Sequence, residues 1–248
     1  MRLAVGLVNL LIGLVYTSYG VMTARELVRG WRTVGPSHFG LAWCAMAFTC
    51  GPHHLAHATH IATGRSPGAL ELATVLVGVP AGVTWFLLRV EAVRGGPGDR
   101  VIAGDPLWVR ALPSLGVLYL GAFLIAAVAP LVDDSRFSPR LTPNLLLIWL
   151  YFMVGYYLLR TQLASRARGE PWSLSGISLT VVFPTCALMH AAYLSGAVRS
   201  EYGADTHGLL IDWLAVPAAA YFLWVVRRLW LGTLPDWNIS LRPLGAAG

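Results

Sequence analysis

Lysine is absent from the sequence, and all 18 basic residues are arginine. A retinal protein is therefore excluded, because retinal is carried as a Schiff base on a lysine side chain. Charged residues are also scarce, at 12% of the chain against 56% hydrophobic residues. A chain this apolar leaves no stretch that is suited to a soluble domain with a solvated surface.

Cysteine is rare as well, with Cys44, Cys50 and Cys186 as the whole complement. All three lie in apolar runs, and an odd number of such cysteines argues against a disulfide framework. Packing and metal ligation remain as their roles. The sequence also shows no nucleophile triad, phosphate-binding loop or paired-carboxylate motif, so motifs alone leave open whether the chain is an enzyme.

What the sequence does contain is a series of long apolar runs separated by short gaps. Runs of about 20 residues are long enough to cross a bilayer as helices. We therefore predict an all-α integral membrane protein with seven transmembrane helices. The first run has no clear small-residue cleavage site, so we expect a retained helix instead of a signal peptide. The expected spans are 3–28, 38–63, 69–91, 109–132, 141–164, 173–197 and 208–231.

The arginines divide unequally between the two sides of such a bundle. Thirteen of the 18 fall around the ends of the first, third, fifth and seventh spans that share one side. Because cytoplasmic loops are enriched in positive charge, we expect the N-terminus outside and the C-terminus in the cytoplasm. The protein is then a multi-pass protein of the inner (plasma) membrane in contact with lipid. The net charge of +6 reflects this topology and indicates no nucleic-acid partner.

An internal repeat relates the two ends of the chain. Residues 49–54 are TCGPHH and residues 185–190 are TCALMH, 136 positions apart. The flanking spans match at offsets of 135 and 137, as in LLIGLVYTSYG against LLLIWLYFMVG and VGVPAGVTWF against LAVPAAAYFL. Parallel repeats pack around an axis along the membrane normal, with a site at their interface. We predict a 3+1+3 parallel internal repeat: a three-helix repeat over 1–95, a linker with the fourth helix over 96–140, and a second repeat over 141–248.

The second predicted span carries a stripe of metal-ligand side chains. At about 100° per residue, its members share an arc of about 120° on one helix face. Polar side chains are costly in a bilayer and tend to be functional, so we predict that this face binds a metal or a cofactor. The stripe consists of Cys50, His53, His54, His57 and His60, and Met46 extends it.

Two Cys-x-x-x-His pairs form the core of the predicted site. Cys50 and His54 are one helical turn apart, and Cys186 and His190 repeat that spacing at a similar depth. Two thiolates and two imidazoles suit copper as Cu(I), or zinc in a closed tetrahedral site. Further ligands or orienting groups are expected from His53, His57, His60, Met46, Met189, His207 and Asp212.

The stretch CGPHHL, followed by LATVLVGVPAGV, resembles the transmembrane module of ethylene receptors and their bacterial relatives. Residues 10–90 resemble one such module, and 145–229 would be a second copy. The resemblance implies three-helix modules that begin outside the cytosol and bind copper(I) through the Cys and His of the motif. The matching positions in this chain are Cys50, His54, Cys186 and His190.

Three functions fit such a site; we predict the first, with copper(I) as the metal, and keep the other two as alternatives. The first is a copper-binding sensor or receptor for a small apolar ligand, which signals through the arginine-rich cytoplasmic loops to a partner protein. The second is a membrane metalloenzyme or redox protein for an apolar substrate, with haem, iron, copper or zinc at the histidine face and a cytoplasmic redox partner. The third is a copper or zinc carrier. The extra histidines favour the second, since a site of two cysteines and two histidines needs none of them.

Overall fold

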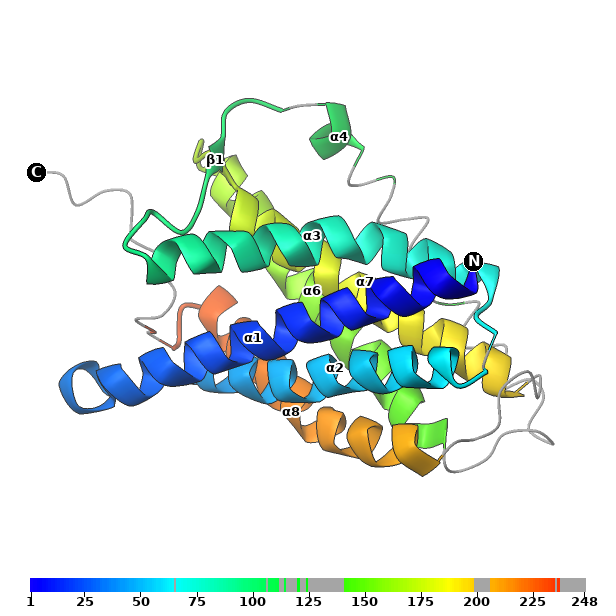
Figure 1. Cartoon of the computed structure of the whole chain (residues 1–248). Helices are drawn as coiled ribbons and strands as arrows, with labels where there is room; N and C mark the ends of the chain where they lie inside the picture. Colours follow the sequence, from blue (N-terminus) through cyan, green and yellow to red (C-terminus); the bar gives the residue numbers. More distant parts are fainter. Residues whose placement is uncertain are drawn as a thin grey trace, which may run out of the picture.

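The computed structural model describes residues 1–64, 66–105, 107–111, 141–198, 206–234 and 236, together with 114, 120 and 124. The expected fourth span, 109–132, and most of the linker around it lie largely outside these residues. Within the described part, the expected all-helical architecture is confirmed (Figure 1). The helices and strands are α1 (Arg2–Val34), α2 (His38–Ala62), α3 (Ala69–Val93), β1 (Val101–Ile102), α4 (Leu107–Arg110), α6 (Thr142–Ala167), β2 (Trp172–Ser173), α7 (Leu174–Val198) and α8 (Thr206–Trp230).

Five of the long helices, α1, α3, α6, α7 and α8, are long and apolar enough to cross a membrane. α2 has a comparable length of 25 residues and carries four histidines within residues 53–60. Large apolar side chains face outward along these helices, with Leu3 and Val28 of α1 both 76% exposed. A soluble monomer rarely exposes so much contiguous apolar surface, whereas lipid covers it in a membrane protein. The number of spans and their orientation stay predictions.

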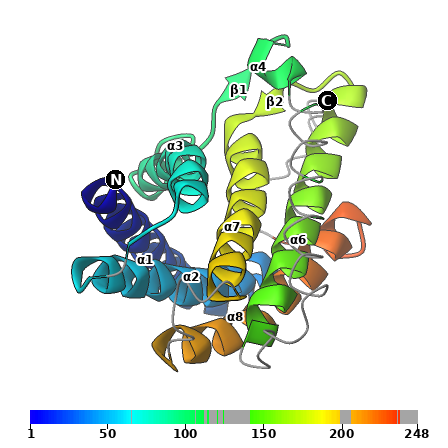
Figure 2. The same cartoon turned by 90° about the vertical axis from the view of Figure 1, so that its right-hand side faces the viewer.

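The six long helices of the described part pack in a pattern that joins the two halves of the chain. α1 packs on α2 and α3, and α6 packs on α7 and α8. Between the halves, α2 contacts α8 and α3 contacts α7 (Figure 2). The side chains that project from α2 and α7 into the centre therefore meet residues supplied by the opposite half.

Close helix contacts and an aromatic core fix this arrangement. A Cβ on Gly51 would lie 2.3 Å from Thr17 Oγ1, and one on Gly155 would lie 2.5 Å from a Pro184 ring carbon. Small residues of this kind let membrane helices approach closely. The core beside these contacts holds Trp43 and Trp85, whose ring centroids are 4.0 Å apart. This rigid core supports the stretch of α2 that carries the cysteine and the histidines.

At one end of the bundle, polar contacts join the segment after α3 to the connection between α6 and α7. β1 pairs antiparallel with β2. The Asp105 carboxylate accepts hydrogen bonds from Arg166 at 3.0 and 3.2 Å and from the Trp172 indole at 2.9 Å. The hydrogen bonds from Arg166 and Trp172 hold the pKa of Asp105 below its usual range. These contacts therefore stabilise the ionised form of the Asp105 carboxylate.

Replacing Asp105 tests this contact through the pH dependence of stability. A pKa lowered by folding stabilises the protein above the unfolded value of about 3.9, and this contribution is lost as the pH falls through the folded value. We expect Asp105→Asn to lower the melting temperature of the detergent-solubilised protein at pH 7, and the difference from wild type to shrink as the pH falls below the unfolded value. A difference independent of pH would contradict this electrostatic account.

Candidate metal centre

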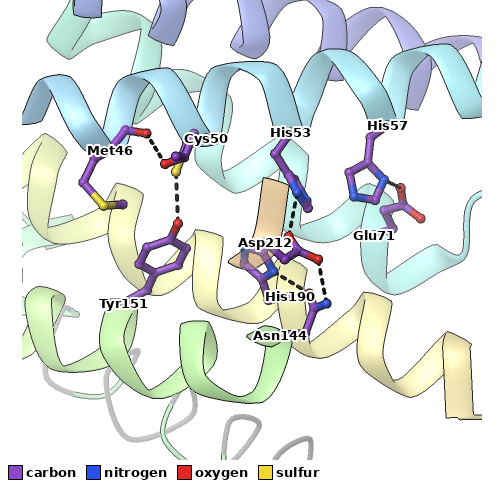
Figure 3. Close-up of polar contacts among 10 residues, drawn as sticks. Met46, Cys50, His53, His57, Glu71, Asn144, Tyr151, His190 and Asp212 are labelled. Carbon is purple, nitrogen blue, oxygen red and sulfur yellow. Dashed lines mark hydrogen bonds and ion pairs between the residues drawn. The ribbon is translucent and has the colours of Figure 1, made fainter. Parts of the chain in front are cut away.

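Three buried side chains from three helices converge at the centre of the bundle (Figure 3). His53 comes from α2, His190 from α7 and Asp212 from α8, and one donor atom of each lies within 4.8 Å of the others. Their relative exposures are 6%, 3% and 1%. Among the described residues, this is the group of three or more His, Cys, Asp or Glu side chains with a geometry suited to a metal ion.

Asn144 of α6 fixes the orientation of His190. The amide nitrogen of Asn144 donates to Asp212 Oδ2 at 2.8 Å, so its amide oxygen must be the atom 2.7 Å from His190 Nδ1. Because an amide oxygen only accepts hydrogen bonds, Nδ1 of His190 carries the proton. The Nε2 lone pair is then available for a metal, with the ring held as in the histidine ligands of known metal sites.

Asp212 presents its other oxygen to His53. Asp212 Oδ1 lies 3.0 Å from His53 Nδ1. Within the described part of the chain this contact is an ion pair and not a well-aligned hydrogen bond. Two donors that are each about 2.1 Å from one ion lie about 3.0–3.4 Å apart at angles of about 90–110°. The spacing of these two atoms therefore fits a shared ion.

His54 has an orienting partner of the same kind. Its Nδ1 lies 2.8 Å from Asn9 Oδ1, and the amide nitrogen of Asn9 donates to the Val5 carbonyl at 2.9 Å. The same argument places the His54 proton on Nδ1 and leaves Nε2 as the free lone pair. His54 lies outside the cluster of three, but it lines the small cavity beside that cluster.

The two cysteines line this cavity and contact tyrosines. Cys50 Sγ lies 3.1 Å from the Tyr151 hydroxyl, and Tyr16 is the hydrogen-bonding partner of Cys186. Neither sulfur belongs to the cluster of His53, His190 and Asp212. Several of the predicted ligands thus line one cavity. The closest group of donor atoms, however, consists of nitrogen and oxygen and contains no sulfur. The lining residues among the predicted set are Cys50, His53, His54, Cys186, Met189 and His190.

The remaining predicted ligands lie at different depths. His57 is buried, with Nδ1 4.0 Å from Glu71 Oε1 of α3, and His60 is half-buried near the end of α2. Met46 belongs to the aromatic core. His207 lies in the first turn of α8, where the structure describes the backbone alone. Of the described side chains, His57, His60 and Met46 thus lie outside the cluster of three.

Sequence reasoning missed Asn9, Asn144 and Glu71. The two asparagines immediately precede the matched segments, as NLLIGLVY and NLLLIWLY, and share the offset of 135 with Tyr16 and Tyr151. An asparagine repeated at the start of two apolar spans was therefore a usable signal. Glu71 was harder to identify from the sequence. It lies in the first turn of α3, where acidic residues are common because they stabilise a helix N-terminus.

No family model, curated protein or solved structure matches the chain significantly. The arguments about function therefore depend on the geometry of the site.

Removal of the Asn144 amide tests whether it orients the cluster. We expect Asn144→Leu to weaken Co²⁺ binding by about 10- to 100-fold, because partners that orient a histidine ligand have effects of this size. Titration of the purified protein, followed by the visible absorption of bound Co²⁺, measures the change. Asn9→Leu is the matched control, since it acts on His54 outside the cluster and should have a smaller effect. Equal effects of the two variants would contradict this assignment.

Proposed function

We propose that the protein is an integral membrane metalloenzyme that uses a metal ion at His53, His190 and Asp212 to transform a small apolar substrate. The observation that carries the proposal is the meeting of two imidazoles and one carboxylate, all buried, within 4.8 Å. Such groups are expensive inside an apolar bundle and are usually retained for function. Burial also keeps the site dry, which strengthens electrostatic contacts with a reacting group.

The donor set indicates the type of metal. Two histidines and one carboxylate with open positions are typical of non-haem Fe(II) centres that activate oxygen. Catalytic zinc uses a similar set, with an open position for water. When bound, the ion would supply redox or Lewis-acid chemistry. We favour iron, because an apolar substrate inside a membrane offers little for hydrolysis.

The surrounding side chains suit this activity. His54 and Tyr151 line the cavity of about 10 Å³ beside the cluster, which has room for about one water-sized molecule. Tyr151 can therefore donate a proton to a bound species, and His54 can accept one. A second cavity of about 20 Å³ adjoins His54 and is lined mainly by apolar residues such as Val75 and Val182. It offers space for a small apolar molecule. A haem needs far more room than either cavity provides.

A copper(I) sensor is the second candidate. It is favoured by one observation, that two cysteines, His54 and Met189 line the cavity beside the cluster. These soft donors suit Cu(I), and a small apolar ligand would bind next to the ion. A partner protein at the arginine-rich loops would then receive the signal. Continuous transport is less favoured, because Cys44 is engaged with the Gly20 carbonyl and His38 with Tyr221.

We also propose that the chain is a 3+1+3 duplication with seven spans and an external N-terminus. The paired contacts support it: Asn9 holds His54 as Asn144 holds His190, and each cysteine faces a tyrosine of the other half. The helix contacts repeat in the same way, α2 with α8 and α3 with α7. The N-terminal orientation rests on the distribution of arginine.

Paired substitutions distinguish the two candidate metal centres. We expect His190→Ala with Asp212→Asn to remove at least one ion per chain from iron-loaded protein in elemental analysis. Cys50→Ala with Cys186→Ala should keep the iron content, because no sulfur belongs to the cluster. The opposite result, with copper bound and lost from the cysteine variant, would favour the sensor. Absence of any bound metal in the wild type would overturn both functions.

A further inference from the structure

The two cavities at the bundle centre occupy equivalent places in the two halves of the chain. The proposed repeat relates residues that line the first cavity to residues that line the second. The related pairs are Tyr151 with Tyr16, Thr49 with Thr185 and Ala215 with Gly78. The cavities also adjoin, because three residues line both of them: His54, Cys186 and Met189. The second cavity is thus the repeat counterpart of the one beside the cluster.

The hydroxyl and imidazole groups around the second cavity already have partners. Thr74 and Thr185 donate their hydroxyls to backbone carbonyls of their own helices, at 2.9 and 2.6 Å. The Tyr16 hydroxyl is hydrogen-bonded with Cys186, and His54 Nδ1 is hydrogen-bonded to an asparagine of α1. A buried water needs two to four polar partners. These groups therefore do little to hold a water, and the cavity favours an apolar occupant.

Most of the remaining wall is apolar. It comes from α1, α3 and α7 and includes Ile12, Val75, Val79, Val182 and Met189. The volume is about 20 Å³, against about 10 Å³ for the cavity beside the cluster. Cavities with apolar walls stay dry and accept apolar guests, and one water needs about 10–15 Å³. The space therefore suits an uncharged molecule of about two heavy atoms.

Gly78 provides this space at the contact between α3 and α7. A Cβ at Gly78 would lie 3.0 Å from the Thr185 methyl carbon, so any side chain there must displace that methyl group or occupy the cavity. The repeat partner Ala215 carries a methyl group and lines the smaller cavity. Glycine in place of alanine is thus one reason why the apolar cavity is the larger of the two.

We propose that the cavity at Gly78 binds an uncharged apolar molecule of about two heavy atoms and holds it next to the metal centre. This inference rests on the proposed function and names the size and chemistry of one reactant. Two sources of that chemistry take part in the function, dioxygen and the apolar substrate. Both favour the bilayer interior over water. Met189, whose side chain is flexible, lies in the wall between the two cavities.

Crystals pressurised with krypton test the site, because krypton is apolar and is located by its anomalous X-ray scattering. We expect krypton beside Val75 in the wild type and none in Gly78→Val, whose added carbons fill the cavity. Val75→Leu fills the same space from another position and should also exclude krypton. Ala73→Val is the matched control, since it adds carbons on the exposed side of α3, and it should retain krypton.

An ordered water in place of krypton in the wild type would overturn the proposal. Krypton retained in both filling variants would overturn it as well.

The oxidation of Fe(II)-loaded protein by dioxygen distinguishes the two sources. If the cavity supplies dioxygen, Gly78→Val should slow this oxidation at unchanged iron content by about 10-fold or more, a typical effect of added bulk in an apolar pocket. Visible absorption follows the reaction. Unchanged oxidation together with loss of krypton would assign the cavity to the apolar substrate. Krypton binding needs no metal, so a protein that holds krypton but no iron would overturn the proposed function and leave the apolar site.

Discussion

The need to satisfy polar groups inside an apolar bundle governs the centre of this protein. Lipid and apolar side chains offer no hydrogen bonds, so the buried imidazole, amide and carboxylate groups depend on partners from within the chain. The contact from His190 through Asn144 to Asp212 meets this need across three helices. It fixes the tautomer of His190, occupies one carboxylate oxygen and leaves the other directed toward His53. Removing any member would leave the others exposed to an apolar environment at a cost of a few kcal/mol.

The two halves of the chain contribute unequally to this centre. At the proposed repeat offsets, Met189 corresponds to His53, and Val75 corresponds to Asp212. One side of the bundle centre therefore has the polar cluster, whereas Met189 and Val75 pack together on the other. A duplicated module can diverge in this way, keeping its histidine–asparagine and cysteine–tyrosine contacts on both sides while it specialises one side for the ion. The apolar side then provides the space beside His54.

Much of this arrangement could be predicted from the sequence. Apolar run length located α3 and α6 within a few residues, but ended the first span at residue 28, whereas α1 continues to Val34. The helical period placed His53 and His57 on one buried face. Spacing along one helix could not show which atoms on other helices would meet that face. The sequence predicted His190 as a ligand and Asp212 as an accessory group. It also predicted Cys50 and Cys186 as ligands, because both belong to a Cys-x-x-x-His pair. The contact between Glu71 and His57 required knowledge of how α3 packs in the bundle, against α1 and α7.

The central claim is that nitrogen and oxygen atoms, not sulfur, hold the ion. X-ray absorption spectroscopy of the metal-loaded protein measures this directly, because light and sulfur scatterers lie at different distances. The account predicts a first shell of nitrogen and oxygen at about 2.0–2.2 Å and no sulfur. A sulfur shell at about 2.3 Å would contradict it and would assign the ion to Cys50 and Cys186.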